Sequence, residues 1–154
     1  MPHLVILYTP NLDRETDMTA LCRELADTML AVRGDDDKPV FPTGGTRVLA
    51  YPASHYAVAD GGAAGRAAGS HTGAASGDPG DYAFIYLHLR MGRGRSAAVH
   101  QRIGDALSAT AKAHFSELFA KRHIGITLQI DEGPEVFDSK HSNLHPLFTT
   151  VSKA

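Results

Sequence analysis

The chain has 154 residues, 43% of them apolar and 21% charged, and a formal net charge of −2. These are the values of one globular domain with its own hydrophobic core, and they exclude the strongly basic field of a nucleic-acid-binding protein. The single cysteine, Cys22, excludes an internal disulfide and a zinc site built from several cysteines. Neither a charged-then-apolar leader nor a run of about 18 apolar residues occurs, so we expect a cytoplasmic protein without a membrane span.

The first part of the chain predicts a strand, a helix and a second strand. Residues 3–8 are nearly all apolar, which is typical of a strand covered on both faces. Apolar residues then recur every three or four positions from Met18 to Val32, the spacing of an amphipathic helix. A second strand is expected over 47–59, and Pro52 within it requires a bend, a break or an edge position.

Residues 61–80 differ in composition from the rest of the chain. They consist mostly of Gly, Ala and Ser, and little in them can fill a core. We interpret this segment as a flexible insert or linker.

A second strand–helix–strand series follows the insert. A strand rich in aromatic and branched residues is expected over 81–89. Ser96 is a natural N-cap for a helix that extends to about Lys121, and a last strand is expected over 124–131. The tail, 133–154, carries apolar residues that need a surface to pack against, on this chain or on a neighbouring subunit.

The predicted elements form two similar units within a single domain, 1–154. The first unit covers 3–59 and the second 81–132, and the insert 61–80 separates them. Two such units pair into one four-stranded mixed sheet with both helices on one face, an α+β fold. The other face of the sheet stays uncovered, so we expect a homo-oligomer.

Pro2 is the first candidate for chemistry. Methionine aminopeptidase removes an initiator Met before a small residue such as proline, which would leave Pro2 with a free secondary amine. Burial at the end of a strand disfavours the charged amine and lowers its pKa toward the range in which a general base works. The alternative is a proline that only protects the amino terminus or begins a strand.

Three arginines are candidates for binding an acidic substrate. Arg47 follows a glycine turn, whereas Arg93 and Arg95 stand in a Gly-Arg-Gly-Arg turn before a helix, whose free N–H groups favour anions. Guanidinium groups bind carboxylates through two parallel hydrogen bonds. For each arginine alone, a surface ion pair is the alternative. The turn lacks the pattern of a dinucleotide-binding motif or a P-loop.

The nine histidines give no convincing metal or hydrolase motif. His141 and His145 are four residues apart, which suits two ligands on one helical face, but no acidic ligand of matching spacing follows. His88 and His114 are expected to be packed and hydrogen-bonded. No Ser-His-Asp order with a nucleophile elbow occurs.

Six short segments, in order along the chain, resemble the 5-carboxymethyl-2-hydroxymuconate isomerase family of the tautomerase superfamily, whose members use an amino-terminal proline. These segments are Met1-Pro2-His3-Leu4-Val5, Phe41-Pro42 with Gly45-Thr46-Arg47, Ala59-Asp60-Gly61, Asp81-Tyr82-Ala83-Phe84, Gly92-Arg93-Gly94-Arg95-Ser96, and Asn143-Leu144-His145 with Leu147-Phe148. The resemblance covers nearly the whole chain apart from 62–80.

The resemblance implies a trimeric isomerase that needs no metal or organic cofactor. The implied reaction is a proton shift on an unsaturated 2-hydroxy or 2-oxo di- or tricarboxylic acid from the degradation of homoprotocatechuate. Pro2 would be the general base, and Arg47 and Arg95 would bind carboxylates and stabilise enolate charge. Two alternatives stay open: a non-catalytic trimer that binds a small acid or a protein partner, and a sister activity such as decarboxylation or dehalogenation.

Overall fold

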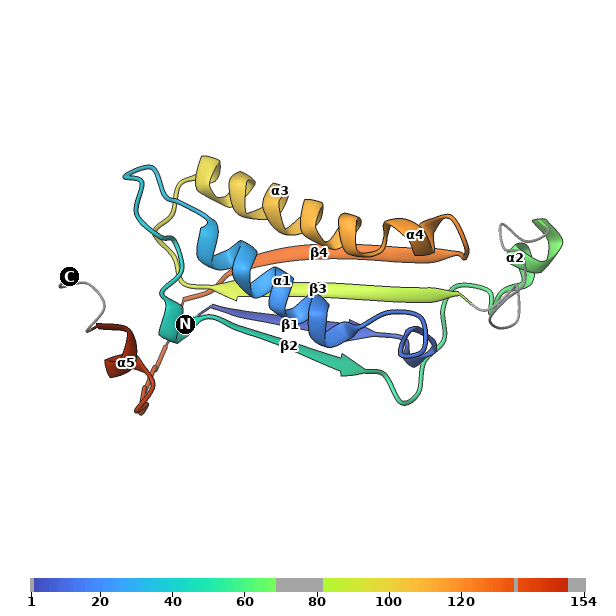
Figure 1. The fold of residues 1–154 in the computed structure, drawn as a ribbon, viewed down its shortest axis with the longest axis horizontal. Helices are drawn as coiled ribbons and strands as arrows, with labels where there is room; N and C mark the ends of the chain where they lie inside the picture. Colours follow the sequence, from blue (N-terminus) through green and yellow to red (C-terminus); the bar gives the residue numbers. More distant parts are fainter. Residues whose placement is uncertain (1, 69–81, 135, 150–154) are drawn as a thin grey trace.

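A computed structural model describes residues 2–68, 82–134 and 136–149 of the chain (Figure 1). The elements are the strands β1 (His3–Tyr8), β2 (Arg47–Pro52), β3 (Ala83–Met91) and β4 (Ile124–Glu132), the helices α1 (Met18–Ala31), α2 (Ala63–Ala68), α3 (Ala97–His114), α4 (Ser116–Phe119) and α5 (His145–Thr149), and the 3-10 turns η1 (Pro10–Leu12) and η2 (Thr43–Gly45). No helix in these ranges is long and apolar enough to cross a membrane.

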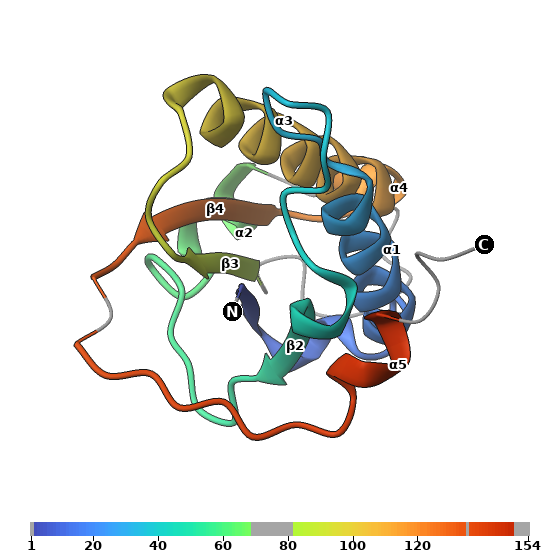
Figure 2. The ribbon, with the colours of Figure 1, turned by 90° about the vertical axis from the view of Figure 1, so that its left-hand side faces the viewer.

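The four strands form one mixed sheet in the order β2-β1-β3-β4. β1 is parallel to β2, β3 is parallel to β4, and the two central strands β1 and β3 are antiparallel. The long helices α1 and α3 lie side by side over one face of the sheet, and the opposite face carries no helix among the described residues (Figures 1 and 2). The predicted pair of β-α-β units with both helices on one face is therefore confirmed.

Alternation along the strands explains this layering. In β1 the buried residues Leu4, Ile6 and Tyr8 face the helices, while the residues between them point to the uncovered face. β3 follows the same alternation, and the helices contribute one apolar stripe each: Met18, Leu21, Leu25 and Met29 from α1, and Val99, Ile103, Leu107 and Ala111 from α3. Each buried large aliphatic side chain stabilises the fold by about 1.5–3 kcal/mol relative to exposure.

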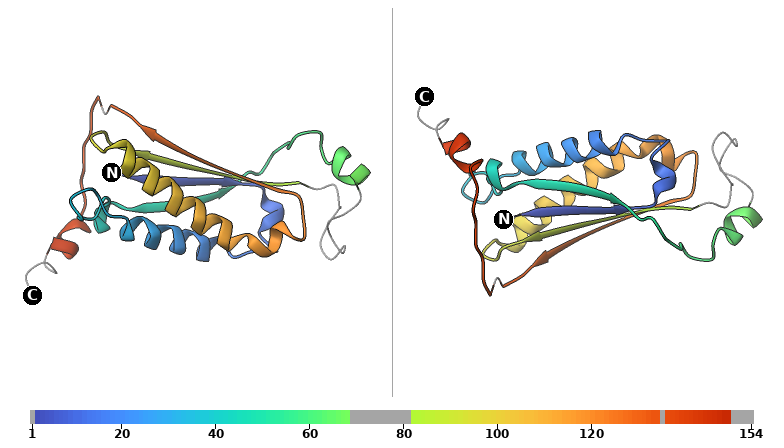
Figure 3. Two further views of the ribbon diagram at one scale, coloured as in Figure 1. Left: turned by 90° about the horizontal axis from the view of Figure 1, so that it is seen from above. Right: turned by 90° about the horizontal axis from the view of Figure 1, so that it is seen from below.

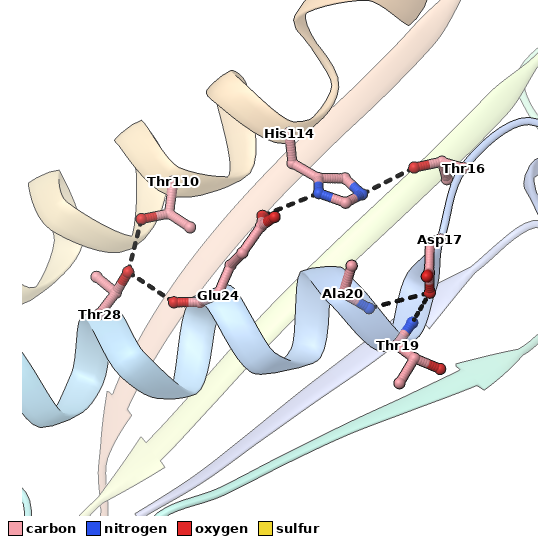
Figure 4. A network of polar contacts seen from close by, with 8 residues as sticks. All are labelled: Thr16, Asp17, Thr19, Ala20, Glu24, Thr28, Thr110 and His114. Carbon is pink, nitrogen blue, oxygen red and sulfur yellow. Dashed lines mark hydrogen bonds and ion pairs between the residues drawn. The ribbon is translucent and has the colours of Figure 1, made fainter.

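A polar network also joins α1 to α3 (Figure 4). The hydroxyls of Thr28 and Thr110 are 2.7 Å apart. The Nδ1–H of His114 donates to the Glu24 carboxylate at 2.9 Å, because a carboxylate can only accept, and Nε2 lies 2.8 Å from the Thr16 hydroxyl. His114 is thus the packed, hydrogen-bonded histidine that the sequence predicts.

The predicted boundaries differ from the observed ones where local chemistry ends an element. Ser96 is the N-cap of α3, as predicted, and its hydroxyl accepts from Val99 N–H at 3.2 Å. α3 ends at His114, and the predicted continuation to Lys121 contains the separate short helix α4. β2 ends at Pro52 instead of reaching 59, and the last hydrogen bond of the pair runs from Ala53 N–H to the carbonyl of Tyr8, at 2.8 Å, where β1 also ends. β2 is an edge strand, one of the three positions that this proline allows.

The described part of the predicted insert is helical. Residues 63–68 form α2, and the two oxygens of the Asp60 carboxylate accept near its start, from Gly62 N–H just before the helix (3.1 Å) and from Ala64 N–H in its first turn (2.9 Å). The Tyr82 hydroxyl accepts from Gly65 N–H at 2.9 Å. The remaining residues of the insert lie outside the described ranges. Composition alone missed α2 because its capping groups stand at the borders of the segment.

The carboxyl-terminal tail packs against its own chain at η2. Helix α5 packs on η2, where a Phe148 ring carbon lies 3.0 Å from the position that a Cβ on Gly44 would take. Leu144 and Leu147 stay exposed. Figure 3 shows α5 at the end of the sheet where β1 begins, and α2 at the opposite end.

Tyr8 allows a direct test of the packing at the far end of β1. Its buried hydroxyl donates to the Asp13 carboxylate at 2.7 Å, and burial together with this hydrogen bond raises the pKa of Tyr8 to about 12. Because the pKa in the folded chain lies above the ordinary value, the stabilisation is complete below about pH 10 and is lost as the pH rises toward 12. In an absorbance titration we expect one late tyrosine transition, and Tyr8→Phe removes it. A wild-type titration without that late step would contradict the assignment.

Candidate active site at the amino-terminal end of the sheet

Pro2 is buried directly before β1, a central strand of the sheet. The next residue, His3, is paired with Arg47 at the start of β2 and with Arg90 near the end of β3. Strand direction therefore brings the starts of β1 and β2 and the ends of β3 and β4 to one end of the sheet, where the turn into α3 also lies (Figure 1). Residues Arg47 and Arg90, far apart in the sequence, therefore lie at the end of the sheet where Pro2 precedes β1.

Arg47 is half-buried, and its guanidinium is held by the turn that precedes β2. One terminal nitrogen, Nη1, donates to the Gly44 carbonyl of η2 at 3.2 Å. Nε and Nη2 have no hydrogen-bond partner among the residues that the structure describes, so they can donate to a carboxylate. Arg47 also lines a groove of about 560 Å³ between α1 and β2, which Phe148 closes on one side.

Arg95 is held more firmly than Arg47. Its Nη1 donates to the Gly92 carbonyl at 2.7 Å, its Nη2 donates to the Val40 carbonyl at 3.2 Å, and its guanidinium lies 5.6 Å from the centre of the Phe41 ring. The preceding residue, Gly94, has φ +106°, which only glycine adopts without strain. Arg95 therefore ties the β3–α3 turn to the loop before β2 and keeps a positive charge there.

Two further arginines at this end of the sheet, Arg93 in the turn before α3 and Arg90 near the end of β3, are exposed. Arg93 makes no hydrogen bond or ion pair within the described ranges. Arg90 was not singled out in the sequence, because its position beside His3 depends on the pairing register of β1 and β3. Only a prediction of that register would have found it.

The electrostatics near Pro2 favour neutral bases. Burial, followed by the positive charges of the amino terminus and of Arg47, lowers the pKa of His3 below its usual value. Burial and positive charge therefore act on His3 in the same direction, toward the neutral imidazole.

His141 and His145 do not form a shared site, and the acidic loop after α1 is engaged in other contacts. Asp35 accepts from the Ser96 hydroxyl at 2.7 Å and from Arg102 at 2.6 Å, so it connects the loop after α1 to the start of α3. His145 begins α5 while His141 precedes the helix, so the two do not share a helical face. No group of three potential metal ligands occurs in the described part of the chain.

The fold defines a class of proteins by its architecture. Two crystal structures, one of Pt0534 inactivated by 2-oxo-3-pentynoate and one of a probable enzyme from Aspergillus fumigatus, share the fold with TM-scores of 0.50 and 0.54 at 16% and 12% identity; the alignments cover 84% and 100% of this chain, and 86% and 96% of those. At this level of identity the two structures show the shared fold alone.

The family within this class follows from closer relatives. The model of the 5-carboxymethyl-2-hydroxymuconate isomerase family matches residues 2–148, and the chain belongs to this family. It is 27% identical over 148 residues to 5-carboxymethyl-2-hydroxymuconate Delta-isomerase of Escherichia coli, which covers 96% of this chain and 99% of the relative.

Two solved structures of the same description agree with this assignment. A 5-carboxymethyl-2-hydroxymuconate delta-isomerase is 59% identical, with a TM-score of 0.87, and an isomerase from Deinococcus radiodurans R1 is 35% identical, with a TM-score of 0.73. Each alignment covers 96% of this chain and 93% of the other. The resemblance found in the sequence is confirmed, and the protein is an isomerase.

Proposed function

We propose that this isomerase shifts a proton along an unsaturated 2-hydroxy or 2-oxo di- or tricarboxylic acid of the 5-carboxymethyl-2-hydroxymuconate type, in the degradation of aromatic compounds. The observation that carries the proposal is the burial of Pro2 at the end of a central strand, among basic residues brought there by strand pairing. Family membership supports the class of reaction. The chain's own residues supply the chemistry, and no metal or organic cofactor takes part in the proposed steps.

Pro2 is the general base in this proposal. After removal of Met1, its secondary amine is fixed by β1 and disfavoured as a cation by burial and by arginine charge. The nitrogen accepts the proton of the 2-hydroxyl group of the dienol, the C=O bond forms, and the conjugated double bonds shift. The protonated amine then delivers the proton to a carbon of the chain, so that no electron or group is gained or lost.

Arg47 and Arg95 bind the substrate in this proposal. Arg47 uses the nitrogens that η2 leaves open to hold a carboxylate. Arg95, already oriented by two carbonyl groups and the Phe41 ring, presents its charge to the oxygen on which negative charge develops. A donor that is oriented before reaction stabilises the dienolate without the cost of reorganising.

We further propose that the active form is a homotrimer assembled through the uncovered sheet face. Leu49 and Tyr51 on β2 and Leu7 on β1 are 43%, 49% and 46% exposed and adjacent in register, which is a contiguous apolar surface. Light scattering after size exclusion should give three times the mass of the chain. We expect Leu49→Asp to yield monomers, since it buries a charge in the contact.

The control is Phe119→Asp, which changes an equally exposed apolar residue on α4 and should leave the trimer intact. A wild-type monomer, or a trimer that survives Leu49→Asp, would refute assembly through this face.

The function itself is tested by intact mass together with a ketonisation assay on 2-hydroxymuconate. We expect a mass that lacks Met1 and turnover that rises with pH through a transition near neutrality, as Pro2 loses its proton. A fully processed protein that turns over neither hydroxymuconates nor other enol acids would overturn the proposal. Product analysis on oxo-acids and haloacrylates separates isomerisation from decarboxylation or dehalogenation.

A further inference from the structure

Arg90 stands at the Pro2 end of the sheet opposite an acidic residue that is engaged elsewhere. Its Cα is paired with that of Asp131 on the parallel strand β4, where the two opposite charges attract each other. The Asp131 carboxylate instead accepts from His88 at 2.7 Å and from Gln129 at 3.1 Å. Those two hydrogen bonds, and to a lesser degree the charges of His88 and Arg90, lower the pKa of Asp131.

The Arg90 side chain consequently keeps its hydrogen-bonding capacity. It makes no hydrogen bond and no ion pair with any residue in the described ranges. Its guanidinium lies against Gly133, where a Cβ would come within 3.2 Å of Nη2 and 3.4 Å of Nε. Gly133 follows β4 and donates to the Met91 carbonyl at 3.4 Å, so the guanidinium lies at the Pro2 end of the sheet, on the β4 side of β3.

Arg47, His3 and Arg90 form a row across three neighbouring strands. His3 is paired with both arginines, and all three side chains point to the uncovered face. The Cα atoms of the two arginines are therefore about 10 Å apart, which is twice the spacing of adjacent strands. Two guanidinium groups at the two ends of this row suit an anion with charges at both ends of a short chain.

We propose that Arg90 binds a second carboxylate of the substrate, opposite the one held by Arg47, and so selects di- and tricarboxylates over monocarboxylates. This inference rests on the proposed function, because it concerns the same site. It assigns to Arg90 a contact with substrate that neither the amino-terminal proline nor the sequence motifs indicate. Gly133 contributes by leaving room for the guanidinium.

The test compares two unreactive probes of equal chain length, hexa-2,4-dienedioate and hexa-2,4-dienoate, by titration calorimetry on the processed protein. We expect Arg90→Gln to weaken binding of the dienedioate by about tenfold or more, the loss of a charge-assisted hydrogen bond, and to leave the dienoate unchanged. Arg90→Lys should recover part of the affinity, since it restores the charge without the planar fork. The matched control is Arg14→Gln, an exposed arginine beyond the opposite end of β1.

Three results would overturn the proposal: equal weakening of both probes by Arg90→Gln, an equal effect of Arg14→Gln, or a changed oligomeric mass in Arg90→Gln. The first and second would show a general effect of charge, and the third would show a contact between subunits. Failure of the proposed function is a separate result. In that case the wild type binds the dienedioate selectively but turns over no enol acid.

Discussion

Replacing Pro2 by Ala should lower kcat/KM by about 10²–10⁴-fold, the usual contribution of a positioned general base. Alanine at this position also permits removal of Met1, but its primary amine lacks the ring that fixes the nitrogen against β1. We expect the loss mainly in kcat, because the amine acts in proton transfer while the arginines keep the substrate bound. The measurement is steady-state ketonisation, with intact mass recorded for each variant so that retained Met1 is not mistaken for a catalytic defect.

Pro10→Ala is the matched control for this substitution. Pro10 begins η1 beyond the opposite end of β1, so its loss removes a proline without touching the candidate site. We expect near wild-type turnover for this variant and unchanged oligomeric mass for both. A processed Pro2→Ala variant with wild-type kcat would refute the assignment of Pro2 as base and would leave proton transfer to another group.

Arg95→Ala should have the second-largest effect, because Arg95 is both an oriented charge and a structural tie. We expect kcat/KM to fall by about 10²–10³-fold, the size of effect seen when one donor to a developing oxyanion is removed. The free energy of unfolding should also fall, by about 1–3 kcal/mol, since the carbonyls of Gly92 and Val40 lose a charged donor. Denaturant unfolding and ketonisation rates measured on the same samples give both numbers.

Arg95→Lys separates the two roles. Lysine keeps the positive charge but cannot reach both carbonyls with a planar fork, so we expect partial activity with most of the stability loss. Arg14→Ala, which removes an exposed arginine at the other end of β1, should change neither quantity. If Arg95→Ala lowers stability without a loss of turnover by the folded fraction, Arg95 is only a structural tie.

The local elements of this protein were predictable because each depends on neighbours in the sequence. The apolar stripes of α1 and α3 are periodic patterns, and β3 is rich in the aromatic and branched residues that favour strands. Ser96 indicates the start of its helix by a hydrogen bond that spans three residues. Pro52 also acts locally, because a proline restricts its strand to an edge position, a bend or a break. The prediction missed α2, because the Tyr82 hydroxyl that supports this helix belongs to a residue 17 positions from Gly65, whose N–H it accepts.

The site shows the same division. Pro2 could be nominated from the sequence, because an amine beside an apolar strand is a local feature, and Arg47 and Arg95 could be nominated from glycine turns and from family resemblance. The hydrogen bond from Arg95 to the carbonyl of Val40, 55 residues away, could not be predicted from the sequence. The hydrogen bond between His88 and Asp131 could not be predicted either. This bond leaves the donors of Arg90, beside His3, without a partner among the described residues.

The sequence by itself determined the order of the strands and helices, the two-unit plan, the family and the amine that we propose as base. Only the tertiary structure decided which cations lie at the end of the sheet where Pro2 precedes β1. The physical reason is register: strand pairing is set by the packing of the whole sheet against α1 and α3, and it brings residues together whose spacing along the chain carries no signal of contact.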